Sequence, residues 1–136
     1  MFRLFLLFLC FAFVFILPAQ AQPEDGPFFS GAYLLELCKK DGGGGEKVKR
    51  GHTACQAYIA GVIDYHDLLR SLGTSPSVDM CVPNTAKTSD LQNIVLAYLE
   101  KNAQHDPFSA APAVALALFE VYPCPKKKTS QKKKKK

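Results

Sequence analysis

The chain has 136 residues, 48% of them hydrophobic, and its formal net charge is +5. Residues 126–136 hold 8 lysines and no acid, whereas residues 22–125 hold 8 basic and 12 acidic side chains, a net of −4. A nucleic-acid-binding domain carries its basic side chains on a folded face, so this distribution argues against nucleic acid as the partner.

The N-terminus, residues 1–21, has the three parts of a secretory signal peptide. Arg3 is the basic residue, residues 4–17 are a fourteen-residue apolar run, and Pro18 precedes a small-x-small cleavage site that ends at Ala21. Fourteen residues are too few to cross a hydrocarbon core of roughly 30 Å as a helix, so a membrane anchor is the weaker interpretation. We therefore expect export, cleavage and a mature domain over residues 22–125.

Four stretches of this domain have the apolar spacing of amphipathic helices, and none has the alternation of a strand. The first stretch, residues 31–40, follows Ser30, a good N-cap residue, and Gly42 can supply a left-handed C-terminal cap. Gly42 also opens a run of four glycines that ends at Gly45. No strand precedes this run and no Gly-Lys-Ser/Thr follows it, so we interpret it as a surface loop and not as a phosphate-binding loop.

The second stretch, residues 51–73, is the longest. At 1.5 Å per residue its helix spans roughly 30 Å, the width of a small domain, so we expect the other helices to pack against it. Ala57 and Gly61 form a smooth strip that another helix could approach closely. Its apolar face consists of Cys55, Tyr58, Ile59, Val62, Tyr65, His66, Leu69 and Leu72.

The third stretch is capped by Thr88 or Ser89, and Ser89 with Gln92 fits a capping box. The fourth follows Ser109 as its cap and stops at Pro123. The connections of about nine, fifteen and seven residues favour antiparallel neighbours. We therefore predict an all-α domain with four helices, with or without an extra short helix.

Four cysteines remain once Cys10 leaves with the signal peptide. An even number in a small exported domain indicates two disulfides, and four cysteines allow three pairings. Cys38 ends the first helix and Cys55 begins the second, while Cys81 precedes the third and Cys124 follows the fourth. If consecutive helices are antiparallel, this geometry favours Cys38–Cys55 and Cys81–Cys124. A disulfide also removes the thiolate that a catalytic cysteine needs.

The other polar residues show no catalytic or metal-binding pattern. The three histidines lack the i, i+4 spacing of a helical metal site, so we expect no metal and no cofactor. Asp64, Asp67 and Asp79 are either part of an acidic binding face or solvated surface. The lysine tail, residues 126–136, is expected to be disordered, and it either contacts anionic membrane lipids weakly or only aids solubility.

Several short motifs, each weak alone, together resemble one known family. In chain order they are Leu35-Glu-Leu-Cys38, Cys55-Gln-Ala-Tyr-Ile-Ala-Gly-Val62, Cys81-Val-Pro83 and Tyr122-Pro-Cys124. Over about residues 28–125 the chain resembles the Rap/Tai family of immunity proteins associated with type VI secretion. The glycine run and the lysine tail are departures from that family.

The resemblance implies a small, all-helical, disulfide-bonded periplasmic protein, and dimers are common among such proteins. It implies a protein partner, a toxic effector such as a peptidoglycan-cleaving amidase, whose active site is blocked without any catalysis by the immunity protein. An acidic surface would steer such a protein to a basic hydrolase. We expect contacts from the second helix, residues 74–87 and residues 102–107. The candidate partner-binding residues are Asp64, Asp67, Asp79, His105 and Asp106.

Two other functions stay open. A periplasmic holdase-type chaperone is also small, helical and disulfide-bonded, and it would bind many unfolded clients on acidification. A cell-wall hydrolase fits less well, because the carboxylates are scattered and no pair recommends itself for glycoside hydrolysis. Suppressed aggregation of an unrelated client at low pH would indicate the chaperone, and a clearing band in zymography would indicate the hydrolase.

Overall fold

The computed structural model describes residues 29–74 and 76–125, and it is built of helices and loops. The elements are α2 (Gly31–Cys38), α3 (Gly51–Ser71), α4 (Thr88–Lys101), the 3-10 helix η2 (Ala103–His105) and α5 (Ala110–Val121). The predicted all-α fold is confirmed, and η2 is the extra short helix that the prediction left open. The predicted signal peptide and lysine tail lie outside the described residues. None of the described helices is long and apolar enough to cross a membrane.

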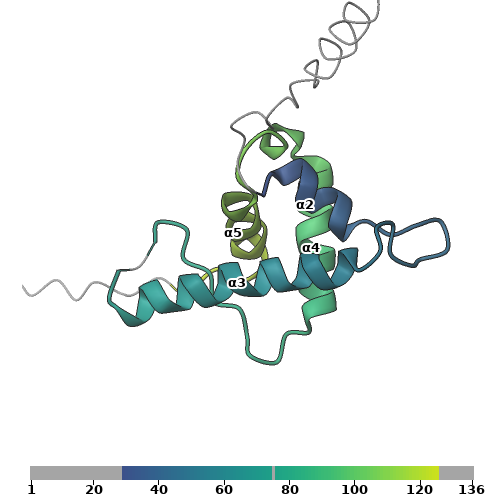
Figure 1. Ribbon diagram of the computed structural model, residues 1–136. Helices are drawn as coiled ribbons and strands as arrows, with labels where there is room; N and C mark the ends of the chain where they lie inside the picture. The colour runs from purple at the N-terminus through teal and green to yellow at the C-terminus, as the bar shows by residue number, and fades with distance from the viewer. Residues whose placement is uncertain (1–28, 75, 126–136) are drawn as a thin grey trace, which may run out of the picture.

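The helices pack with one of them crossing the others. Figure 1 shows α4 and α5 side by side, with α3 running across both. α4 leads up to η2 and α5 returns from it, so these two helices are antiparallel, as predicted. α3 instead crosses its neighbours, and its C-terminal half extends past them.

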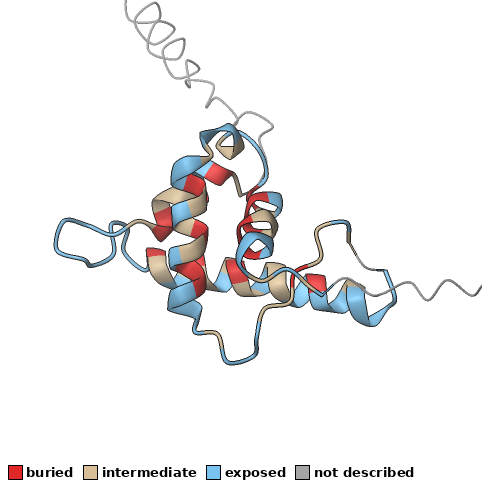
Figure 2. Cartoon of the chain, turned by 180° about the vertical axis from the view of Figure 1, so that it is seen from behind, coloured by how far each residue is buried: buried red, intermediate tan, exposed pale blue. Residues whose placement is uncertain are grey.

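The core lies where α3 meets the other helices. Its buried apolar side chains are Leu34, Leu37, Cys38, Cys55, Ile59, Met80, Leu91, Val95, Leu99, Ala110, Ala113, Val114, Ala117 and Leu118. The prediction of one continuous buried face on α3 is wrong at its C-terminal end, because Tyr65 is 63% and Leu72 is 69% exposed. Figure 2 shows this end of α3 mostly exposed, since none of the other described helices covers it.

Both predicted disulfides are present. Cys38–Cys55 joins the end of α2 to the first turns of α3, and Cys81–Cys124 joins the segment before α4 to the segment after α5. They close loops of 17 and 43 residues. The first bridge therefore fixes α2 to α3, and the second fixes the segment before α4 to the segment after α5.

The glycine run forms a defined turn and not an irregular loop. α2 ends before Lys39, which is extended, so Gly42 does not cap this helix as predicted. The four glycines instead turn around Asp41, whose carboxylate accepts backbone hydrogen bonds from Gly43 and Gly45 at 2.9 and 2.7 Å. An aspartate that bonds the backbone two residues on is a common way of stabilising a tight turn.

The predicted capping box at Ser89 and Gln92 is absent. α4 begins at Thr88, and its N-cap is Lys87, which makes no capping side-chain bond. Gln92 is only 3% exposed, and its amide donates to the carbonyl of Cys38 at 3.0 Å. The side chain of Gln92 points to the buried face of α4, so it does not bond the backbone at the start of this helix.

Two other local predictions concern helix ends and packing. Ser30 caps α2 as predicted, because its hydroxyl accepts from the backbone N–H of Tyr33 at 3.2 Å. Ser109 occupies the N-cap position of α5 but makes no capping side-chain bond. Ala57 and Gly61 are exposed, so the expected close approach of another helix there is wrong.

Candidate functional site

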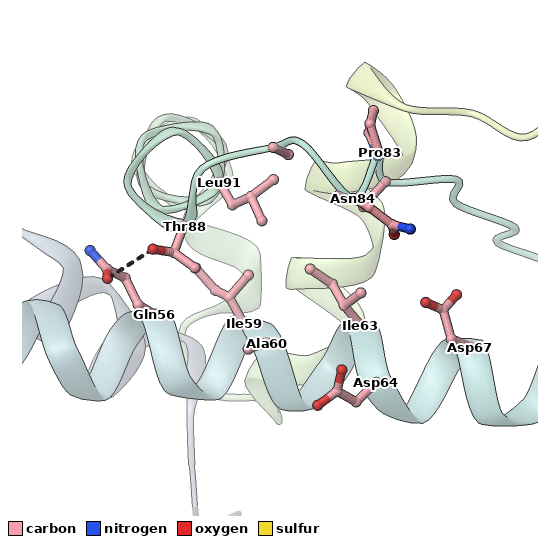
Figure 3. A pocket seen from close by; sticks show the side chains of 12 residues that line it. Gln56, Ile59, Ala60, Ile63, Asp64, Asp67, Pro83, Asn84, Thr88 and Leu91 are labelled. Carbon is pink, nitrogen blue, oxygen red and sulfur yellow. Dashed lines mark hydrogen bonds between the residues drawn. The ribbon is translucent and has the colours of Figure 1, made fainter.

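A groove runs between α3 and the segment that leads into α4 (Figure 3). We name it the α3 groove, and its volume is about 170 Å³. It is lined by Gln56, Ile59, Ala60, Ile63, Asp64, Asp67, Val82, Pro83, Asn84, Ala86, Thr88 and Leu91. The α3 members recur three and four residues apart, so they form one stripe along the helix. The Cys81–Cys124 disulfide holds the start of the opposite wall.

The α3 groove has an apolar floor and a polar edge. Ile59 and Leu91, which form part of the floor, are 1% and 5% exposed. At one end the hydroxyl of Thr88 donates to Gln56 at 3.2 Å, and at the other end Asp67 projects from α3 on the side of the opposite wall (Figure 3). None of the lining residues carries a positive charge. The groove therefore suits an apolar group that also bears a cation.

His66 connects α3 to the loop that precedes α4. This side chain is buried, and its Nε2 accepts from the backbone N–H of Met80 at 3.3 Å. Its two ring nitrogens each face a carboxylate, with Nδ1 3.7 Å from Asp67 Oδ1 and Nε2 3.5 Å from Asp79 Oδ1. Arg70 Nε lies 3.4 Å from Asp79 Oδ1. His66 is thus a structural side chain that holds the loop, and the acidic residues gather around it.

The structure brings three of the predicted partner-binding residues together. Asp64 and Asp67 are exposed and line the α3 groove, and Asp79 is partly exposed beside the same histidine, His66. We name Asp64, Asp67 and Asp79 the acidic face.

The other two predicted residues, His105 and Asp106, lie elsewhere. The helix α4 starts at the groove and ends before η2, a distance of roughly 20 Å at 1.5 Å per residue. His105 Nε2 is 3.3 Å from the hydroxyl of Tyr98, whose pKa is raised by burial and then by the charge of Glu120. The Asp106 carbonyl accepts from the N–H of Ala32 at 3.1 Å. These residues therefore join η2 to α2 and α4, and they do not extend the acidic face.

A second hollow lies between α4 and α5, with a volume of about 260 Å³. Its lining includes both Lys101 and Glu120, so its charge is balanced, and none of the predicted partner-binding residues lines it. Across residues 29–74 and 76–125 there is no cluster of histidine, cysteine and acidic residues that could hold a metal ion. Burial raises the pKa of the Tyr58 phenol above its ordinary value.

Sequence reasoning missed several residues around the site. Gln56 precedes Ile59 and Ile63 at helical spacing, so the α3 stripe was readable from periodicity. Arg70, three residues after Asp67, was readable as a helical ion pair. The opposite wall, residues 82–88, falls almost wholly within the expected contact segment, residues 74–87. No pattern in the sequence predicted that this segment packs against α3, because only the position of the loop brings it there.

One comparison with known proteins identifies the chain. The sequence model of one protein family, the Rap1a immunity proteins, matches residues 30–124. These residues include every described helix and both disulfides. No curated protein and no solved structure matches the chain. The matched region agrees with the cysteine motifs that resembled the Rap/Tai family. The chain therefore belongs to the family of Rap1a immunity proteins.

Proposed function

We propose that this protein binds a toxic effector in the periplasm and inhibits it by occluding its active site. The family match over residues 30–124 supports the proposal, because an immunity protein acts by binding an effector and not by catalysis. The two disulfides fit an oxidising compartment such as the periplasm. The effector class that we propose is a peptidoglycan amidase or hydrolase delivered by type VI secretion.

The cross-linked fold favours inhibition by a preformed surface. Both disulfides and a core shared by α2, α3, α4 and α5 hold the described residues in one arrangement. A protein that is already ordered loses less conformational entropy on binding than one that must fold on its partner. We therefore expect the bound and free backbones to differ little.

The acidic face is the surface that we propose for the effector. Two of its carboxylates, Asp64 and Asp67, stand at a groove with an apolar floor and no positive charge in its lining. A surface of this kind fits a basic side chain with a long apolar stem, such as lysine or arginine. Opposite charge also speeds the encounter of two proteins. His105 and Asp106, at the far end of α4, are proposed as a separate second contact.

The test is inhibition of a hydrolase by the purified protein. The product of the neighbouring open reading frame is the first candidate effector, assayed for hydrolase activity by release of dye from labelled peptidoglycan. We expect saturable inhibition by the native protein. The double variant Asp64→Lys and Asp67→Lys should slow association more than tenfold at low salt, because steered association depends steeply on charge. Glu100→Lys, an exposed acid on α4 outside the groove, is the matched control and should bind normally.

The outcomes separate the proposed functions. Unchanged association of the Asp64 and Asp67 double variant would remove the acidic face from the proposal, while saturable inhibition would still support immunity. Suppressed aggregation of an unrelated client at low pH, without any saturable partner, would support the holdase-type chaperone instead.

We also propose, from the family resemblance, that the protein forms a homodimer, which sedimentation equilibrium of the mature chain tests directly.

A further inference from the structure

The C-terminal segment leaves the fold beside the acidic face. Its last described turn pairs with the loop before α4, because the N–H of Cys124 donates to the carbonyl of Asp79 at 3.0 Å and the N–H of Cys81 donates to that of Tyr122 at 2.7 Å. The Cys81–Cys124 disulfide fixes the same two segments to each other. The pairing is antiparallel, so the chain reaches Asp79 as it leaves. Cys124, the second-last described residue, therefore lies next to Asp79 of the acidic face.

The acidic face has more negative than positive charge. Arg70 is shared, with Nη1 at 3.9 Å from Asp67 Oδ1 and Nε at 3.4 Å from Asp79 Oδ1. Asp64 makes no salt bridge with any residue that the structure describes. Two of the three carboxylates thus share a single guanidinium and the third has no such partner among the described residues, so the face can accept further cations.

The sequence supplies those cations within reach. Residues 126–136 contain 8 lysines and no acid. Eleven extended residues cover at most roughly 35–40 Å, whereas all 21 residues of α3 span roughly 30 Å. Because the segment is tethered only two residues after Cys124, its effective concentration at the face is of the order of millimolar. A free basic partner has no such advantage.

We propose that the lysine run, residues 126–136, docks on the acidic face of its own chain. The lysines supply the charge that Asp64, Asp67 and Asp79 lack, and they leave when a more basic surface displaces them. The run therefore acts as a tethered competitor that weakens the binding of weakly basic partners to this face. This contact involves a single chain, so it stands or falls independently of the identity of any effector.

The first test compares two full-length, oxidised, mature chains by amide NMR. One is native, and the other has all eight tail lysines changed to glutamine, which alters no residue of the described fold. At an ionic strength of about 0.01 M, where the Debye length is about 30 Å, we expect shifted amides at residues 64–67 and 79–82. The differences should vanish at about 1 M, where that length is about 3 Å. Amides near Glu100 are the control and should coincide throughout. Coincident amides at residues 64–67 and 79–82 at low salt would overturn the proposal.

The second test identifies the occupant of the face. Carbodiimide coupling joins lysine amines to nearby carboxylates, and an equal mixture of labelled and unlabelled chains reports whether a link lies within one chain. We expect links within one chain from tail lysines to Asp64, Asp67 or Asp79. In the double variant Asp64→Asn and Asp67→Asn, only the links to Asp79 should remain. Links only between chains would assign the face to a second copy. Links that are absent, with tail-dependent binding to anionic vesicles, would assign the tail to a membrane surface. Either of these results would overturn the proposal.

Discussion

Gly31 and Gly61 are both helical, yet the structure predicts opposite effects of replacing each with alanine. A Cβ added at Gly31 would lie 2.3 Å from the carbonyl oxygen and 2.8 Å from the carbonyl carbon of His105. The first turn of α2 packs directly on the backbone of η2, so this contact cannot be relieved by rotating a side chain. A Cβ added at Gly61 would meet nothing within 4 Å.

The magnitudes follow from these two environments. Overpacking a core typically costs about 1–3 kcal/mol, and Gly31→Ala should lie at the upper end because the obstacle is backbone. The shift would also strain the hydrogen bonds of Gly31 N–H to the Phe108 carbonyl and of Ala32 N–H to the Asp106 carbonyl, at 2.9 and 3.1 Å. Gly61→Ala should stabilise the fold by about 1 kcal/mol, the difference in helix propensity.

Thermal unfolding of the oxidised proteins, followed by circular dichroism, measures both changes. In a domain of this size 1 kcal/mol moves the midpoint of thermal unfolding by about 4–8 °C. We expect a fall of more than about 10 °C for Gly31→Ala and a rise of about 5 °C for Gly61→Ala. If Gly31→Ala were as stable as the native chain, the packing of α2 on η2 would be wrong. If both variants lost stability, the open surface of α3 at Gly61 would be in question.

Three further predictions concern the interior, a surface ion pair and a disulfide. Gln92→Leu should destabilise the fold by about 1–3 kcal/mol, because it removes a buried amide that bonds the end of α2 and leaves that carbonyl without its partner. Hydrogen bonds from two nearby lysines lower the pKa of Glu36 from 4.5 to about 2, so carboxyl NMR should show a titration below the ordinary range, and Lys47→Gln should raise it. Because this pKa is depressed by folding, the ion pairs support the fold above about pH 4.5 and lose that effect as the pH falls through about 2. Replacing Cys81 and Cys124 by alanine should cost about 4 kcal/mol in the chain-entropy model, measured by urea unfolding.

Each of these has an outcome that contradicts it. Native stability in Gln92→Leu would mean that water satisfies the carbonyl at the end of α2. A Glu36 carboxyl that titrates near 4.5, or that ignores Lys47→Gln, would mean that the two lysines do not hold it in solution. A stability loss well under 4 kcal/mol without the Cys81–Cys124 bridge would show that the hydrogen-bonded pairing of the two segments suffices.

The positions of the helices were predictable because they depend on residues close in the sequence. The α3 pattern predicted residues 51–73, and the helix covers Gly51–Ser71. The pairing Cys81–Cys124 was predictable as well, since it needed only the order of the helices and two antiparallel ends. Two local errors concern helix capping. Gly42 lies in the turn around Asp41 and Gln92 bonds the carbonyl of Cys38, and neither residue caps a helix.

The amino-acid sequence by itself determined an all-α domain, its helices and its two disulfides, because periodicity and the order of helix ends are properties of the chain. The tertiary structure alone decided that α3 crosses its neighbours, which leaves Tyr65 and Leu72 uncovered and opens a groove against residues 82–88. It also decided that Asp79 joins Asp67 around His66. The physical reason is that the direction of a helix after a long loop depends on the packing of side chains distant in the sequence, and no local pattern records that direction.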